Sequence, residues 1–158
     1  MRKADREVKN ADELKAILEK CDVCRLGLAA DDVPYIVPMN FGYEYTDGNL
    51  TLYFHCAGEG KKLDILTQNP QVCFEMDCSH ELKKSDRPCG YSMNYESIIG
   101  NGVAEICHER DEKIYGLTRL MEKYSDARTF EFPERELERV TVVRVAATSF
   151  TGKRLKKG

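Results

Sequence analysis

The feature that most restricts the fold is residues 35–45, where large apolar side chains occupy every second position. These alternate positions carry Tyr35, Val37, Met39, Phe41, Tyr43 and Tyr45. Successive side chains of a β-strand point to opposite faces, so this period predicts one long strand with an apolar face. The aromatic side chains are expected in the core, because aromatic residues are common on buried strand faces. Pro38, on the other face, cannot donate to a hydrogen-bond ladder and predicts an edge, a bulge or a position open to a ligand.

Shorter strands and helices are expected on both sides of this stretch. Asp31-Asp32 and Asp47-Gly48 predict tight hairpin turns before and after it. Asn10, with Glu13 three residues later, predicts the capped start of a helix. The other expected strands are residues 25–30, 50–56, 72–76, 91–107 with a bulge or bend at 100–102, and 137–150. The other expected helices are residues 61–68 and 111–124, and residues 79–88 are expected to form a mobile loop.

These elements predict a single domain, residues 1–158, that is mainly β with flanking α-helices. Six strands joined by hairpins favour an antiparallel Greek-key barrel with helices at its ends. An open α+β sandwich is the alternative. Hydrophobic residues make up 42% of the chain and charged residues 32%, which is typical of a soluble domain. No apolar run approaches the roughly 20 residues of a membrane-spanning helix, so no membrane association is expected.

Charge and cysteine content argue against several other classes of protein. The one basic cluster, residues 153–157, is short, and no nucleic-acid partner is expected from it. The chain has seven cysteines, an odd number, and no secretory signal is visible at the start of the sequence. We therefore expect free thiols in the cytoplasm rather than a framework of disulfides. Cys21 and Cys24 form an isolated C-x-x-C pair, for which packing is favoured over a redox or metal site, and no metal is expected.

Residues 55–62, His-Cys-Ala-Gly-Glu-Gly-Lys-Lys, predict an anion-binding turn. A strand ends here, the glycines allow a tight turn, and Lys61 and Lys62 enter the first turn of a helix. The N-terminus of a helix favours anions, whereas lysines there are unfavourable unless an anion offsets them. Either a phosphate site or two solvated lysines fits the pattern. The hairpin places residues 38–41 beside His55, where a planar ring could lie along two strands with its phosphate at the lysines.

These segments, taken in order, resemble one known family. The chain is similar to the nitroimidazole-resistance (Nim-type) branch of the pyridoxamine 5'-phosphate oxidase-like family from about Arg2 to Lys153. The resemblance rests on residues 34–43, 52–62, 69–74, 95–104 and 151–153. It implies an FMN-binding split β-barrel, working as a homodimer with flavin at the subunit interface. Lys61 and Lys62 would hold the FMN phosphate, and Pro38, Met39, Asn40, Phe54 and His55 would line the flavin ring, with Ser97 contributing from the long strand.

The resemblance also implies an activity, for which alternatives stay open. The first is an FMN-dependent oxidoreductase that reduces a small acceptor, including nitroaromatic compounds such as 5-nitroimidazoles, with His55 as a proton donor or as a wall of the flavin pocket. In such an enzyme the cofactor carries the redox chemistry and the protein positions it. The second is a flavin- or haem-binding protein without its own turnover. A pyridoxal-phosphate binder on the same scaffold is a third.

Overall fold

The structure, a computed structural model, describes residues 3–156. Its strands are β1 (Glu7–Val8), β2 (Cys24–Ala30), β3 (Val33–Met39), β4 (Gly42–Thr46), β5 (Asn49–Ala57), β6 (Gln71–Lys83), β7 (Ser92–Cys107) and β8 (Val140–Leu155). Its α-helices are α1 (Ala11–Lys20), α2 (Lys61–Gln68), α3 (Arg110–Tyr124) and α4 (Glu134–Arg139), and short 3-10 turns cover Ala4–Arg6 and Pro88–Gly90. No helix in this part of the chain is both long and apolar enough to cross a membrane.

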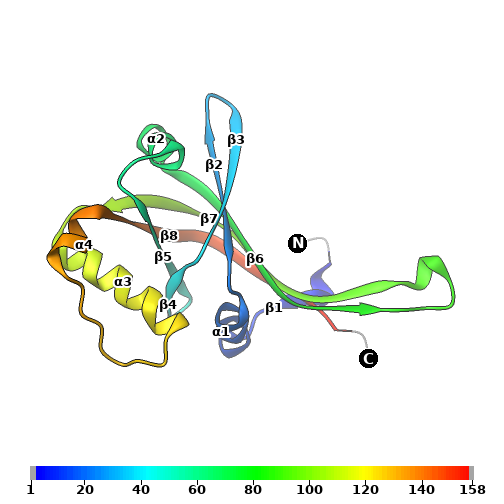
Figure 1. Cartoon of the computed structure of the whole chain (residues 1–158). Coiled ribbons are helices and arrows are strands. Elements are labelled where there is room, and N and C mark those ends of the chain that lie inside the picture. Colours follow the sequence, from blue (N-terminus) through cyan, green and yellow to red (C-terminus); the bar gives the residue numbers. More distant parts are fainter. Residues whose placement is uncertain (1–2, 157–158) are drawn as a thin grey trace.

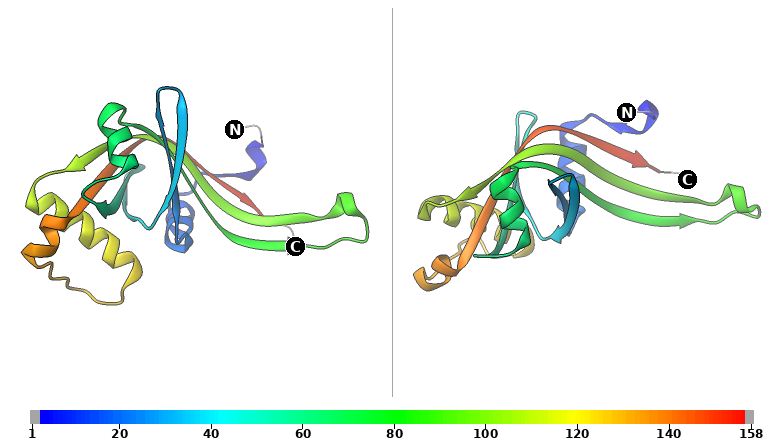
Figure 2. Two further views of the ribbon diagram at one scale, coloured as in Figure 1. Left: turned by 45° about the horizontal axis from the view of Figure 1, so that its top comes forward. Right: turned by 90° about the horizontal axis from the view of Figure 1, so that it is seen from above.

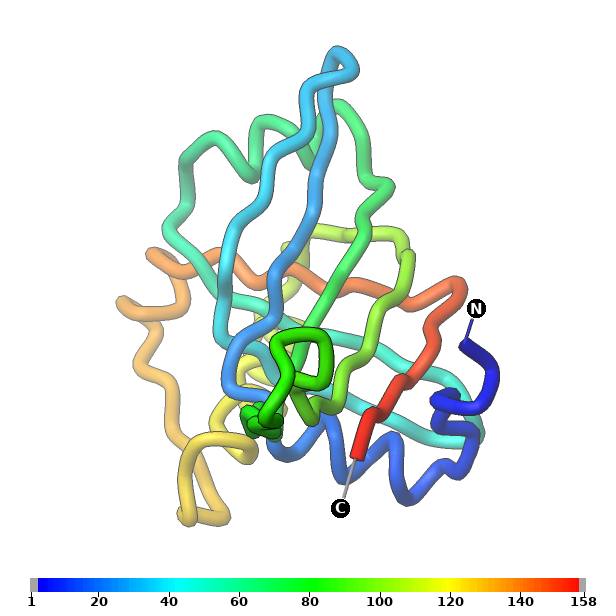
Figure 3. The backbone as a smooth tube through the Cα atoms, turned by 90° about the vertical axis from the view of Figure 1, so that its right-hand side faces the viewer, coloured from blue at the N-terminus to red at the C-terminus, as the bar shows by residue number. Residues whose placement is uncertain are grey.

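All eight strands belong to one antiparallel sheet that curls into a split barrel. The strand order is β3-β2-β6-β7-β8-β5-β4, and β1 pairs with β8. Figure 3 shows the strands passing around a common interior. The edge strands β3 and β4 are not hydrogen-bonded to each other, so the sheet stays open at this seam. The predicted fold class, mainly antiparallel β with flanking helices, is confirmed.

The predicted long strand over residues 35–45 is in fact two strands at opposite edges of the sheet. β3 pairs with β2, and β4 pairs with β5. Only Asn40 and Phe41 lie between them, so one continuous segment crosses from one edge of the sheet to the other (Figure 1). The alternation of side chains continues through the break, because Phe41 is fully buried and its neighbours on the apolar face pack against the same core. The position of Pro38 at an edge strand is confirmed.

Hydrogen bonds hold this two-residue link in place. The Phe41 N–H donates to the Tyr124 hydroxyl at 3.1 Å, and that hydroxyl donates to the Asp22 carbonyl at 2.8 Å. The Asn40 amide donates to the same carbonyl at 3.1 Å. The Lys123 ammonium lies 4.8 Å from the centroid of the Phe41 ring. The end of α3 thus supplies the partners that the link lacks in the sheet, as buried backbone groups require.

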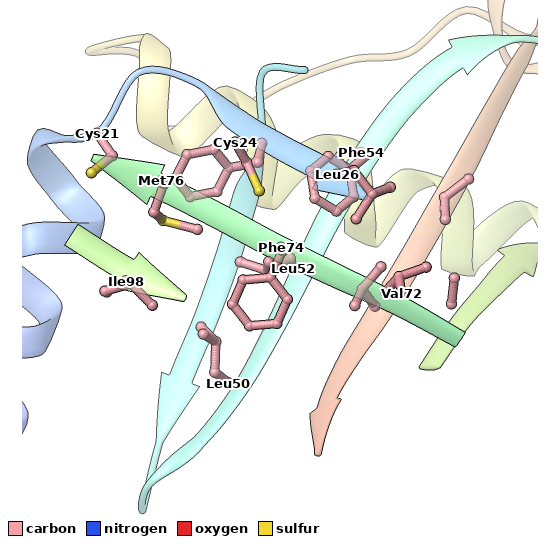
Figure 4. Packing of buried hydrophobic residues seen from close by; sticks show 14 of the residues in the cluster. Cys21, Cys24, Leu26, Leu50, Leu52, Phe54, Val72, Phe74, Met76 and Ile98 are labelled. Carbon is pink, nitrogen blue, oxygen red and sulfur yellow. The ribbon is translucent and has the colours of Figure 1, made fainter. Parts of the chain in front are cut away.

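The barrel interior is a single apolar core. Phe41, Phe54 and Phe74 are fully buried there with leucine, isoleucine and valine side chains from most strands (Figure 4). Cys21 and Cys24 are both buried free thiols, as packing residues would be. Leu14, Ile17 and Leu18 of α1 complete the core from one side. The predicted cap of α1 is confirmed, since the Glu13 N–H donates to the Asn10 side chain at 3.0 Å.

β6 and β7 extend beyond the barrel as a two-stranded arm, on the side away from α3 and α4 (Figure 2). β6 continues to Lys83, so much of the predicted loop over residues 79–88 is strand. The predicted irregularity at 100–102 is confirmed by a register shift between Asn101 and Gly102. At the base of the arm, Glu96 accepts hydrogen bonds from Lys20 at 2.8 Å and Arg154 at 2.6 Å. These bonds tie α1, β7 and β8 together.

Strand number is where the prediction differs most. The described residues form eight strands rather than six, because the long strand is divided and β1 adds a short edge beside β8. The final strand begins at Val140, since residues 134–139 form α4. The hairpin turns at Asp31-Asp32 and Asp47-Gly48 are confirmed, and all four residues have the positive φ that such turns need.

Gly42, just after the link, lets α3 approach β4 very closely. A Cβ atom there would lie 2.5 Å from the Arg119 carbonyl carbon, which belongs to the α3 backbone. We expect Gly42→Ala to lower the free energy of unfolding by about 1–3 kcal/mol, because the helix has to move. Denaturant unfolding measures this change. Gly58→Ala, which introduces a methyl group with no neighbour within 4 Å, is the matched control. Equal stability of the two variants would contradict the close approach.

Candidate functional site

The N-terminus of α2 has the properties of an anion site. Gly60 precedes the helix with φ of 133°, a conformation that favours glycine. No side chain caps the helix, so amide groups of its first turn are left for another acceptor. Within residues 3–156, neither Lys61 nor Lys62 has a carboxylate oxygen within 4.0 Å. A phosphate group therefore fits this turn, and the predicted extent of the helix, Lys61–Gln68, is confirmed.

The open seam of the barrel leads to this turn. The β4–β5 ladder ends at the pair Gly42 and Tyr53, while β5 continues to Ala57 and pairs only with β8. β3 pairs only with β2. Continued by count, the β4–β5 register sets Asn40 against His55. At the far end of the seam, the Lys61 ammonium lies 4.7 Å from the centroid of the Tyr35 ring on β3. The two unpaired strand edges thus lie between the link and the start of α2.

The predicted ring-lining residues of β3 lie along one edge of the seam. Pro38 is exposed and points outward, and Met39 packs against the core. Asn40 is exposed in the link and uses its amide group to bond Asp22. The expectation that residues 38–41 pair with the strand that contains His55 is wrong. β3 is hydrogen-bonded to β2, whereas β5 is hydrogen-bonded to β4 and β8. The free edge of β3 nevertheless leaves backbone groups open to a ligand.

On β5, Phe54 and His55 point in opposite directions, as the alternation predicts. Phe54 is fully buried in the core, so only its backbone can reach a ligand in the seam. His55 is exposed, and it lies beyond Tyr53, the side chain against which α3 packs.

Ser97 lies apart from the other predicted site residues. It is on β7, opposite Asp77 of β6 and Lys153 of β8. β2 and β6 separate it from β3, and β8 separates it from β5. Within one chain, Ser97 is therefore not beside the predicted residues of β3 and β5, which flank the open seam.

A groove lies on the outer side of β2, β3 and β6. It measures 710 Å³ and is lined mainly by apolar side chains and strand backbone, including Ile36, Gly27 and Cys73. Its size is in the usual range of ligand sites. None of the predicted site residues lines it. The sequence did not predict this groove or the contact between Tyr35 and Lys61. Ile36 and Ile99 were the available signal, because alternation in a strand predicts polar residues at outward-facing positions and these two are apolar.

Comparison with known proteins identifies the family. Residues 10–154 match the family model described as pyridoxamine 5'-phosphate oxidase. The chain belongs to this family. A candidate 5-nitroimidazole antibiotic resistance protein from Bacteroides thetaiotaomicron is 32% identical, with a TM-score of 0.80 over 94% of this chain and 86% of that one. The resemblance to the pyridoxamine 5'-phosphate oxidase-like family and its nitroimidazole-resistance branch is thereby confirmed.

More distant structures share the fold. The flavocytochrome Anf3 from Azotobacter vinelandii is 18% identical, with a TM-score of 0.81 over 99% of this chain and 72% of that one. An FAD- and haem-binding protein from Mycobacterium smegmatis is 16% identical, with a TM-score of 0.82 over 96% of this chain and 74% of that one. A comparison with curated proteins found no match.

Proposed function

We propose that this protein is a homodimeric, FMN-dependent oxidoreductase of the cytoplasm that reduces a small acceptor, including nitroaromatic compounds. The observation that carries the proposal is the pair Lys61 and Lys62 at a helix N-terminus that no side chain caps, at the end of an open seam. Membership of the family and the flavin-binding neighbours support a flavin as the ligand. The 32% identity to the candidate nitroimidazole-resistance protein supports the class of acceptor.

Each part of the seam has a role in this proposal. Lys61 and Lys62, with the amide groups of the first turn of α2, bind the phosphate. The free edges of β3 and β5, at Pro38–Asn40 and Phe54–His55, orient the polar rim of the flavin ring, and Met39 keeps water from one side. When bound, FMN would supply two-electron redox chemistry between a reduced nicotinamide and the acceptor. His55 donates a proton from an imidazole nitrogen to the reduced acceptor.

The second copy of the chain in the proposed dimer covers the outer sheet face. Ile36 is 67% exposed and Ile99 is 52% exposed. The register of the strands places both on the same side of the sheet. Ile36 is opposite Gly27, Gly27 is opposite Cys73, and Cys73 is opposite Asn101 of β7. Ile99 is two residues from Asn101 on the same strand, so its side chain points to the same face. This apolar surface, with the 710 Å³ groove, is the type of patch that marks a protein interface. Ser97 lies on the same face, where it reaches the flavin of the partner.

Reversing the charge of the phosphate site tests the cofactor. We expect Lys61→Glu with Lys62→Glu to weaken FMN binding by about tenfold or more, because two charge-assisted contacts become repulsive. A flavin fluorescence titration measures the affinity. Lys9→Glu with Lys84→Glu makes the same change in net charge at exposed positions elsewhere. Unchanged affinity in the first double variant, or an equal loss in the second, would refute the phosphate site.

Replacing His55 separates catalysis from binding. We expect His55→Gln to keep FMN affinity while lowering the rate of multiple-turnover reduction of a 5-nitroimidazole by about a hundredfold, within the usual contribution of general acid catalysis. His108→Gln, also at an exposed histidine, is the control. A wild-type protein that is reduced once and then stops would instead indicate a flavin-binding protein without turnover.

A charge placed on the outer face tests the dimer. We expect Ile99→Lys to raise the dimer dissociation constant by about tenfold or more, because an unpaired ammonium would be buried at the interface. Sedimentation analysis measures the constant. Ala11→Lys, at an exposed position on α1, adds the same charge away from this face. A dimer as tight as that of the wild type would assign the interface to another surface.

A further inference from the structure

Three residues from separate segments meet on the outer side of the sheet, at the base of the arm. Arg6 precedes β1, Tyr95 is on β7, and Lys153 is on β8. β8 brings them together, since Lys153 is opposite Glu7 of β1 on one side and Ser97 of β7 on the other. The Lys153 ammonium lies 5.8 Å from the centroid of the Tyr95 ring. All three side chains are half-buried.

The two cations in this cluster lack an acidic partner. In the described part of the chain, no carboxylate oxygen lies within 4.0 Å of Lys153 or Arg6. Glu7, the nearest in register, pairs with Lys9 at 3.4 Å instead. The Arg6 Nε atom is shielded from solvent and has no hydrogen-bond partner among residues 3–156. By contrast, Arg154, the next residue along β8, bonds both Glu13 and Glu96 at 2.6 Å.

Both cations act on the same hydroxyl group. Burial raises the pKa of Tyr95, but hydrogen bonding and charge from Lys153 and Arg6 outweigh burial and hold that pKa below its usual value. Two positive groups that converge on one phenol oxygen repel each other, and a bound anion offsets this repulsion. A guanidinium, an ammonium and a phenol hydroxyl are together all donors, the set that an oxyanion requires.

We propose that Arg6, Tyr95 and Lys153 form a binding site for an oxyanion, the phosphate or carboxylate group of a small ligand. Within one chain the site is separate from the turn at Lys61 and Lys62, because the two lie at opposite ends of β8. The end of β5 that leads into α2 pairs with Val140 at the start of β8, whereas Lys153 lies near its end, opposite Glu7 and Ser97. FMN carries a single phosphate, so the cluster takes a group from a different molecule. The cluster uses none of the seam residues of its own chain. Because Lys153 is opposite Ser97 on the outer face, it lies beside the partner's flavin in the proposed dimer, and to that extent the assignment rests on the proposed function.

The test follows Tyr95 directly, in full-length protein labelled with 13C-tyrosine and assigned with Tyr95→Phe. Inorganic phosphate and acetate are titrated separately and monitored by NMR. We expect a saturable shift of the Tyr95 signal with one of them, and a rise in the pKa of Tyr95 at saturation, because the bound anion offsets the two cations. Saturation with phosphate only identifies a phosphate group, and saturation with acetate only identifies a carboxylate.

Variants decide whether the cluster is the site. Lys153→Gln and Arg6→Gln are each expected to weaken binding by about tenfold, the loss of one charge-assisted hydrogen bond. Lys156→Gln, an equal charge change at an exposed residue of the same segment, is expected to leave it unchanged. Lys61→Gln with Lys62→Gln should weaken FMN binding and leave the Tyr95 response intact, which separates the two sites. No saturation with either anion, or equal weakening by Lys156→Gln, would overturn the proposal.

Discussion

The two-residue link at Asn40 and Phe41 is the constraint on which the barrel depends. Because β3 and β4 are parts of one segment, the sheet has to curl until its opposite edges are two residues apart. Phe41 then lies in the core, and the end of α3 satisfies the backbone of the link through Tyr124. The same arrangement leaves β3 and the end of β5 without a shared ladder. The open seam is therefore a direct result of how the barrel closes.

Local signals in the sequence predicted the elements well but missed where strands change partners. The cap at Asn10, the turns at Asp31-Asp32 and Asp47-Gly48, and the helix Lys61–Gln68 each depend on neighbouring residues and were found. Side-chain alternation, however, reports only which face is buried. It continues unbroken through Phe41, where the hydrogen-bond partner changes from β2 to β5. A change of partner is a tertiary property that the alternation does not carry.

The candidate site was predictable to a similar extent. The lysines and the glycine turn of α2 form a contiguous motif with a local physical cost, and this motif made the proposed anion site visible in the sequence. Resemblance to the family added the residues of β3 and β5. The contact of Lys61 with Tyr35 and the cluster of Arg6, Tyr95 and Lys153 join segments far apart in the chain. No spacing rule connects such residues, so only the fold could assemble them.

β8 occupies a position with consequences for how the protein is made. It lies inside the sheet and pairs with β1, β5 and β7, yet it is the last strand in the chain order. During synthesis on a ribosome, the strands before β8 emerge first. β8 joins the group β3-β2-β6-β7 to the pair β5-β4, so these two parts of the sheet stay separate until β8 has emerged. β6 and β7 can pair early, but β5 joins the sheet only once residues 140–146 of β8 have left the exit tunnel. Folding is thus expected after synthesis of this domain, and chaperones would meet a nascent chain with exposed apolar strands.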